Sequence, residues 1–235
     1  MGCASGHATI TPTDGDITPT PDGMDEIPSD APPTDATVMV DAKPIDAHVD
    51  APSITPPDAY QCQTMTRQLL MNPVLDLTPS GMGWIQQNID NAYPIITDQD
   101  GLAEQSPPFK AWMGGFVAPT LGGSVTDVLY QDVTVPMGTT QLRLTGYYAV
   151  GTQETGSIAY DSGSVALTQT NGTPIETVIS LSNVTPVATW TALDKVFTTN
   201  VSGQTVRLRF TSTNDDSLVT NFFYDTLALT ATYCQ

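Results

Sequence analysis

The sequence predicts an all-β protein: a two-sheet antiparallel β-sandwich of the jelly-roll type, preceded by a disordered N-terminal segment. Two observations indicate this fold. From Cys62 onward the chain is a series of short apolar runs separated by Gly, Pro and Asn turn residues, which is the pattern of a sandwich or barrel. None of these runs keeps the apolar period of about 3.6 residues that marks an amphipathic helix, so we expect helices to be few and short.

The clearest strand pair lies near the C-terminus. Both of its runs are apolar with a period of two: the first is Val206-Leu208-Phe210, and the second extends from Phe223 through Leu227-Leu229. Successive side chains of a strand point to opposite faces, so Arg207 and Arg209 share the face away from Leu208. A polar loop joins the two runs, and we expect them to form a half-buried antiparallel pair.

The earlier strands are expected in order along the chain. They are assigned to residues 69–76, 83–85, 93–97, 111–116, 128–135, 141–150, 158–170, 175–181 and 190–198. Pro73 lies within the first of them and cannot donate a ladder hydrogen bond, which indicates an edge strand or a strand end. Turn sequences such as Pro136-Met137-Gly138 and Asn171-Gly172 separate the later runs.

Residues 1–61 have a different composition, rich in Pro, Thr, Asp and Ala and almost free of aromatic residues. The dipeptide Asp-Ala recurs at irregular spacing, at Asp30, Asp35, Asp41, Asp46, Asp50 and Asp58. So little apolar surface cannot offset the entropy lost on ordering, and the prolines disfavour helix. We therefore expect a disordered acidic stalk over 1–61 and a folded head over 62–235.

The chain is strongly acidic, with a formal net charge of −18. The stalk holds 11 acidic residues against one lysine, and the head holds 14 acidic and six basic residues. Such a chain repels phosphate backbones and anionic lipid headgroups, and its sequence contains no basic stripe. We therefore expect no nucleic-acid partner, and contact with a membrane only through a lipid anchor.

Three cysteines, Cys3, Cys62 and Cys234, are too far apart for a zinc site of the C-x-x-C type, and both histidines lie in the stalk. In an antiparallel sandwich the first and last strands are often neighbours, so we expect Cys62 and Cys234 to form a disulfide. Two unrelated buried thiols are the alternative. A disulfide would indicate an oxidising compartment, and so an extracellular or outer-surface location.

Gly2-Cys3, followed by a polar and flexible stretch, is similar to the cleavage end of a bacterial lipoprotein signal, in which the cysteine becomes the lipidated first residue. The apolar half of such a signal does not precede it here. We expect lipid at Cys3, with an ordinary unpaired cysteine as the alternative. Lipid at Cys3 would place the head at the outer cell surface, held away from the membrane by the stalk.

The head contains no histidine, which excludes Ser-His-Asp and Cys-His catalysis and a His-ligated zinc site there. Hydrolysis of glycosides by two carboxylates needs no histidine and stays open. Nothing in the spacing of the 14 acidic residues marks two of them as a facing pair. We therefore expect the protein not to be an enzyme.

Several segments resemble galactose-binding-like, carbohydrate-binding-type jelly-roll modules, which accompany catalytic domains in secreted bacterial peptidases and glycosidases. These segments are LYQDVTVP (129–136), LTGYYAVGTQET (144–155), AYD (159–161), GQTVRLRF (203–210), DSLVTNF (216–222) and YDTLAL (224–229). Trp112 with Gly114-Gly115, and NPVLD (72–76) followed by Gly83-Trp84, are similar to the same modules. The resemblance covers most of residues 70–230. It implies the fold more than the ligand, because such modules bind sugars, proteins or calcium.

The resemblance also implies a structural calcium ion near the first and last strands, with an acidic residue of the closing strand among its ligands. Asp225 occupies that position and shares strand phase with Phe223, so its carboxylate is expected to face inward and to need a partner. Asp98, Asp100 and Asp76 could supply further oxygens. An Asx turn for Asp98 and Asp100, and a backbone hydrogen bond for Asp225, are the alternatives.

Sugar binding needs exposed aromatic rings with hydrogen-bonding groups nearby. The resemblance places all three tryptophans, Trp84, Trp112 and Trp190, in the core. Tyr147 is the better platform, because its strand phase is opposite to that of the apolar side chains around it and the same as that of Arg143.

If the strand of Tyr147 and Arg143 shared a sheet with that of Arg207 and Arg209, one open face would carry an aromatic ring and three guanidinium groups. Such a face would suit an acidic glycan. A solvated face that balances negative charge is the alternative. The sequence thus predicts a non-catalytic, surface-anchored binding module with extracellular carbohydrate as the first candidate ligand. A structural or adhesive head for a surface protein, and an orphan accessory domain of a secreted hydrolase, are the other candidates.

Overall fold

The computed structural model describes residues 62–88, 93–115 and 124–235, all of which belong to the head. The proposed stalk over 1–61 and the proposed lipidation site at Cys3 lie outside the described residues. The stalk, its boundary with the head and the lipid at Cys3 therefore stay predictions.

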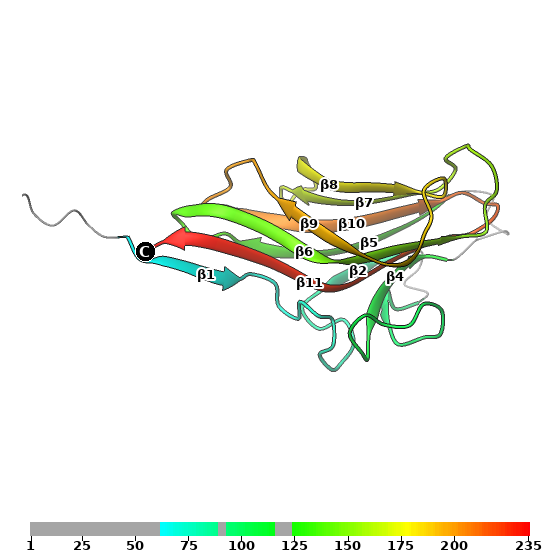
Figure 1. The fold of residues 1–235 in the computed structure, drawn as a ribbon, viewed down its shortest axis with the longest axis horizontal. Coiled ribbons are helices and arrows are strands. Elements are labelled where there is room, and N and C mark those ends of the chain that lie inside the picture. The colour runs from blue at the N-terminus through cyan, green and yellow to red at the C-terminus, as the bar shows by residue number, and fades with distance from the viewer. Residues whose placement is uncertain (1–61, 89–92, 116–123) are drawn as a thin grey trace, which may run out of the picture. The chain divides into compact units, whose positions relative to one another are not determined.

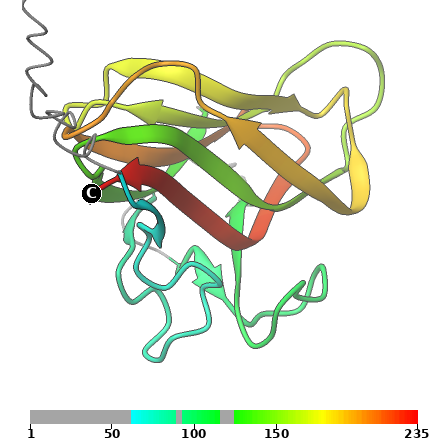
Figure 2. The same cartoon turned by 60° about the vertical axis from the view of Figure 1, so that its left-hand side comes forward.

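The described residues form eleven strands in two antiparallel sheets that pack face to face (Figures 1 and 2). The strands are β1 (Thr64–Gln68), β2 (Ile85–Gln87), β3 (Ile96–Thr97), β4 (Lys110–Gly114), β5 (Val125–Thr134), β6 (Thr139–Thr152), β7 (Ser162–Thr168), β8 (Pro174–Ser182), β9 (Val187–Val196), β10 (Thr205–Asn214) and β11 (Thr220–Cys234). Sheet A has the order β3-β4-β11-β6-β9, with β1 also paired to β11. Sheet B has the order β2-β5-β10-β7-β8.

This arrangement confirms the predicted all-β sandwich. Every pairing between strands is antiparallel, and neighbours in a sheet are often far apart in the sequence, as in β11 between β4 and β6. In the part of the chain that the structure describes, no helix is long and apolar enough to span a membrane.

The core lies between the two sheets and follows the alternation predicted from the sequence. In β10, Val206, Leu208 and Phe210 are almost completely buried, whereas the side chains between them are half-buried or exposed. The ring of Phe210 meets Tyr224 of sheet A with centroids 4.8 Å apart, and Trp84 with centroids 6.0 Å apart. Both contacts have the edge-to-face geometry typical of packed aromatic rings, and the one between Phe210 and Tyr224 joins the two sheets.

The strand predicted over 69–76 is wrong. Asn72 and Leu75 have φ of 55° and 69°, a left-handed conformation that a strand does not contain. The backbone carbonyl of Asn72 accepts a hydrogen bond from the indole N–H of Trp84 at 3.0 Å. The segment therefore buries its apolar side chains from a loop, and the first strand is β1, which directly precedes it.

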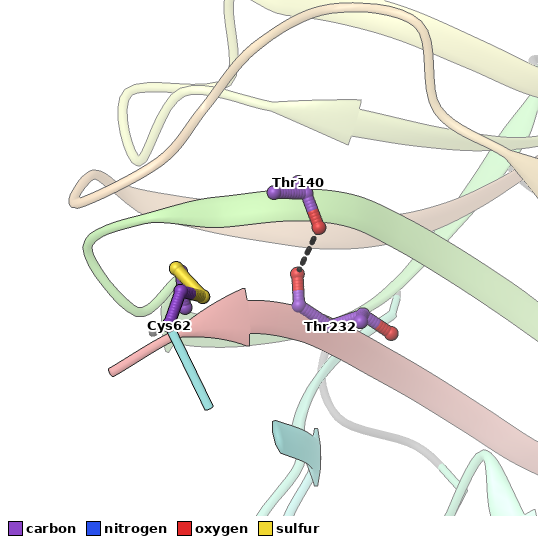
Figure 3. Close-up of a disulfide and its surroundings, with 4 residues drawn as sticks. Cys62, Thr140 and Thr232 are labelled. Atoms are coloured by element: carbon purple, nitrogen blue, oxygen red, sulfur yellow. Dashed lines mark hydrogen bonds between the residues drawn. A yellow bond between two sulfur atoms is a disulfide. The ribbon is translucent and has the colours of Figure 1, made fainter. Parts of the chain in front are cut away.

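The two ends of the head are neighbours, as predicted. β1 pairs with residues 230–234 of β11. Cys62 and Cys234 form a disulfide, with their Cα atoms 5.4 Å apart (Figure 3). On the other edge of β11, the hydroxyl of Thr140 in β6 donates to the carbonyl of Thr232 at 3.1 Å (Figure 3). The C-terminal end of β11 is thus held on both edges.

Removal of the disulfide should destabilise the head. We expect the double variant Cys62→Ser/Cys234→Ser to lose about 5 kcal/mol of unfolding free energy, because the bond joins residues 172 positions apart and so restricts the unfolded chain. Equilibrium denaturation followed by tryptophan fluorescence measures the difference. Cys3→Ser is the matched control and should unfold as the wild type does. Equal stability of the double variant and the wild type would contradict this account.

Candidate functional site

The structure does not bring the four predicted ligand residues to one face. Arg143 and Tyr147 lie in β6 of sheet A, whereas Arg207 and Arg209 lie in β10 of sheet B. Each points away from the core, but the two sheets turn these outer faces in opposite directions. The condition for a single shared face, that these strands lie in one sheet, is therefore not met. Alternation within a strand does not determine which sheet the strand joins.

Two of these guanidinium groups are held by carboxylates. Arg143 donates to Asp194 from Nε at 2.7 Å and from Nη2 at 2.5 Å. Arg207 donates to Asp132 from Nε at 2.7 Å and from Nη2 at 3.0 Å, and it lies 3.7 Å from the ring centroid of Tyr130. A bidentate pair occupies two of the five N–H donors of each guanidinium group and offsets its charge. An acidic glycan would therefore have to compete with Asp194 or Asp132 for these arginines.

The four carboxylates proposed as calcium ligands do not converge. Asp98 and Asp100 are exposed in the turn that follows β3, whereas Asp225 is fully buried and Asp76 is half-buried. Among the described residues, no group of three or more His, Cys, Asp or Glu side chains is placed to hold a metal ion. Only Asp76 and Asp225 lie close enough for the charge of one to raise the pKa of the other.

Asp225 is buried, but its side chain lies on the outer side of sheet A, whereas its strand phase predicts the core side. The register of β11 against β6 shifts between Asp225 and Ala228, and Thr226 has φ of 53°. This bulge reverses the alternation, so that Tyr224 before it and Leu227 after it both belong to the core. Asp225 therefore points to the outer face of sheet A.

A loop over residues 98–109, here called the anchored loop, is bonded to this buried carboxylate. One oxygen of Asp225 accepts the backbone N–H groups of Gln105 at 2.8 Å and Ser106 at 2.9 Å. The other oxygen accepts the N–H of Thr226 at 2.5 Å. Three backbone donors thus satisfy a carboxylate that would otherwise be costly to bury.

Asp76 holds the same loop from the side. It accepts the hydroxyl of Ser106 at 2.6 Å and the N–H of Phe109 at 3.2 Å. Burial raises the pKa of Asp225 from 3.8 to about 6; the backbone N–H groups lower it, and the nearby charge of Asp76 raises it further. A calcium ion bound by this pair would have to compete with the donors of the loop, so the donor set is against the ion that the resemblance implies.

Two further side chains, Lys110 and Trp190, fix the anchored loop on sheet A. Lys110, whose side chain is fully buried, donates to the carbonyl of Gln99 at 2.7 Å and to the carboxylate of Glu104 at 2.7 Å. The indole N–H of Trp190 in β9 donates to the carbonyl of Ala103 at 2.8 Å. A buried ammonium without its partners would be strongly unfavourable, so the Lys110 contacts hold the loop in place.

Trp112 of β4 is an aromatic side chain of the outer face. Ala111 and Met113 on either side of it are fully buried in the core, so Trp112 points away from the core and is half-buried. Its indole N–H donates to the side-chain oxygen of Asn221 at 2.8 Å, and its ring lies 5.4 Å from that of Phe223. The ring is therefore held in position while part of it stays accessible.

The core positions implied for the tryptophans are confirmed only for Trp84, which is 5% exposed. Trp112 and Trp190 are half-buried on the outer face of sheet A, so for them the prediction is wrong. The signal that could have revealed Trp112 is Gly114-Gly115 after it. A Cβ on Gly115, which has φ of 73°, would meet the indole nitrogen of Trp112 at 2.8 Å, so glycine there leaves room for the ring.

Two hollows of about 280 Å³ each flank Trp112. The first lies toward β3, and its polar lining groups include Thr97 and Gln99. The second lies toward β6 and β9; Phe223 makes part of its apolar lining, and Asn221 offers a polar group. We call them the β3 hollow and the β9 hollow.

Tyr147 lines a third hollow of about 480 Å³ on the same sheet, together with Val74, Thr145 and Asp194. Its phase away from the core is as predicted, and its role in binding stays a prediction. Trp112, Trp190 and Tyr147 define what we call the aromatic face of sheet A. In β6, Ala149 and Gly151 line the β9 hollow and Tyr147 lines the Tyr147 hollow, and Ala149 and Tyr147 are about 7 Å apart along the strand.

The sequence matches no protein-family model and no curated protein. Among solved structures, the chain is similar to a family 61 carbohydrate-binding module in complex with β-1,4-galactotriose (13% identity, 69% of this chain and 97% of that chain, TM-score 0.42). It is also similar to the K3 adhesin domain of Lys-gingipain from Porphyromonas gingivalis (10% identity, 71% and 99%, TM-score 0.45). A third is the family 11 carbohydrate-binding module of a Clostridium thermocellum cellulosomal cellulase (13% identity, 66% and 92%, TM-score 0.33). The similar structures thus include modules of the kind that the sequence resembles.

Asp225 should make stability depend on pH. Its pKa is about 6 in the folded head against an ordinary 3.8, so the folded state holds the proton more tightly. The stability that this proton contributes is complete below about pH 4 and is lost as the pH rises through about 6. Over that rise in pH, the unfolding free energy of the wild type should fall by at most about 3 kcal/mol relative to that of Asp225→Asn. Urea denaturation at several pH values measures this difference.

The matched control is Asp98→Asn, which removes an exposed carboxylate and should follow the wild type at every pH. Parallel stability profiles for the wild type and Asp225→Asn would show that Asp225 does not titrate as described.

The same proteins test the calcium prediction. Since backbone donors occupy Asp225, we expect millimolar calcium to leave the melting temperature unchanged. A calcium-dependent rise that is lost in Asp225→Asn would instead place the ion there.

Proposed function

We propose that the head is a non-catalytic module that binds extracellular carbohydrate on the aromatic face of sheet A. The observation that supports this most is Trp112: a half-buried ring, held by Asn221 and Phe223, between two hollows. A rigid aromatic ring offers a flat apolar surface to the C–H face of a sugar and loses little conformational entropy on binding.

The polar groups around the ring suit the hydroxyls of a sugar. Thr97 and Gln99 line the β3 hollow, and Asn221 lines the β9 hollow. Mostly apolar hollows with a few amide and hydroxyl groups are typical of sites that bind small polar ligands. The Tyr147 hollow extends the same face, so a chain of several sugar units could contact both ends of it.

A second candidate function has its own observation. Three loops at one end of the sandwich are tied together: Asn183 accepts the backbone N–H of Asp161 at 3.1 Å, and Asp161 accepts that of Asp215 at 2.9 Å. They present the exposed apolar side chains of Ile158 (60%) and Leu218 (44%). A rigid loop cluster with exposed apolar residues would suit an adhesive head that binds a surface protein.

We further propose that the head works outside the cell, anchored through lipid at Cys3. The disulfide between Cys62 and Cys234 supports an oxidising compartment. Mass spectrometry of the protein isolated from its source membranes should find a diacylglyceryl group on Cys3. An unmodified Cys3 peptide, or recovery of the protein only in the soluble fraction, would contradict the anchor.

Loss of the Trp112 ring should abolish most of the binding. On an array of neutral, acidic and amino-sugar glycans, we expect the full chain to bind a defined set, and Trp112→Ala to weaken the best ligand about 30-fold, the equivalent of about 2 kcal/mol of lost ring burial. Trp112→Phe keeps a ring and should recover part of the affinity. Titration calorimetry on the best ligand gives the dissociation constants.

Tyr130→Ala is the matched control, since it removes an aromatic ring from the outer face of sheet B and should leave binding unchanged. Circular dichroism and an intact disulfide show that each variant is folded. Binding that survives Trp112→Ala and is lost in Tyr130→Ala would move the site to sheet B. The adhesive function is favoured if no glycan on the array binds and a specific protein partner binds the wild type but not the double variant Ile158→Asp/Leu218→Asp.

A further inference from the structure

Four of the six basic residues of the head are paired with acidic ones. The ion pairs are Lys110–Glu104, Arg143–Asp194, Lys195–Glu176 and Arg207–Asp132, with nitrogen–oxygen distances from 2.5 to 2.8 Å. Arg209 lies in sheet B, and Arg67 lies in β1 near the disulfide; neither lines a hollow of the aromatic face. Among the described residues, no lysine or arginine side chain lines a hollow of the aromatic face.

Open carboxylates, by contrast, stand beside Trp112. Asp98 and Asp100 are both exposed, and they alternate along the chain with Gln99 of the β3 hollow and Gly101 of the β9 hollow. Neither takes part in an ion pair among the described residues. The turn that carries them touches the ring itself, because a Cβ on Gly101 would lie 3.1 Å from the six-membered ring of Trp112.

This turn is not loosely attached. The carbonyl of Gln99 accepts the buried ammonium of Lys110 at 2.7 Å, and the N–H of Gln99 donates to the hydroxyl of Thr97 at 3.2 Å. Both bonds involve the residue between the two carboxylates. The backbone that carries Asp98 and Asp100 is therefore fixed beside the hollows, as part of the anchored loop. The two exposed carboxylates line neither hollow themselves but flank the lining residues Gln99 and Gly101.

Two forces at this place act in the same direction on a positive charge. The face of an indole ring attracts an ammonium group, and tryptophan is the best of the aromatic side chains at doing so. Nearby carboxylates attract it too, and a chain with a net charge of −18 repels anions over its whole surface. Acidic glycans are disfavoured at this site, and cationic ones are favoured.

We propose that the hollows beside Trp112 bind an amine-bearing sugar, with the ammonium group of a glucosamine-type unit between the Trp112 ring and the carboxylates of Asp98 and Asp100. The proposal rests on the carbohydrate-binding function proposed above and names the ligand class for the same site. It also gives the two exposed carboxylates, predicted from the sequence as metal ligands, a role in recognition.

The test compares two hexamers with the same β-1,4-linked ring, one of glucosamine and one of N-acetylglucosamine, by titration calorimetry with the full chain. At a pH where the amine is protonated and exposed carboxylates are ionised, we expect the glucosamine hexamer to bind about fivefold tighter, as for a solvent-exposed ion pair. Added salt should remove this preference, because it screens exposed charges.

The double variant Asp98→Asn/Asp100→Asn should lose the preference and keep its affinity for the N-acetylglucosamine hexamer. The matched control is Asp215→Asn/Asp216→Asn, which removes the same charge from the loop between β10 and β11 and should keep the preference. If both double variants lose it equally, the effect belongs to net charge and the proposed site is wrong.

Other outcomes separate this proposal from the function on which it rests. If the two hexamers bind equally, or if only neutral glycans of the array bind, the ammonium site is overturned while carbohydrate binding stands. Tighter binding of polyuronates than of glucosamine would also overturn it. If no glycan binds the folded head, carbohydrate binding and the ammonium site fall together.

Discussion

The head depends on the hydrogen bonds of β11, which pairs with β6 along one edge and with β4 and β1 along the other. No other strand has three partners in the described part of the chain. Its bulge between Asp225 and Ala228 changes which residues of the strand face the core. Before the bulge, Phe222 and Tyr224 fill the core while Phe223 supports Trp112, and after it Leu227 returns to the core.

The anchored loop follows from this same bulge. Because Asp225 is turned outward, its carboxylate needs donors, and the backbone of Gln105 and Ser106 supplies them. The buried ammonium of Lys110 adds a second requirement that the loop satisfies. Buried charges of this kind contribute little net stability, yet each is costly if its partner leaves, so they specify one position of the loop. Because Gln99 and Gly101 of this loop line the hollows beside Trp112, fixing the loop also fixes the hollows.

Local alternation predicted the sandwich and the core face of β10, and the usual neighbourhood of the first and last strands in such a sandwich predicted the disulfide. Alternation failed wherever the outcome depended on a long-range choice. Arg143 and Arg207 have the predicted phase but lie in different sheets, and a bulge that no residue pattern announced turned Asp225 outward. Trp112 was misplaced because the resemblance implied a core position. The burial of its neighbours Ala111 and Met113, which turns Trp112 outward, is not visible in the sequence.

The bond between Cys62 and Cys234 also bears on how the head resists force. Tension that enters through the chain before Cys62 passes directly into β11 through a covalent link, since the two residues are joined at the point of entry. A pulling force applied before Cys62 therefore cannot begin to unfold the head by separating β1 from β11 one hydrogen bond at a time. The load reaches β11, the longest strand, which is paired along both edges.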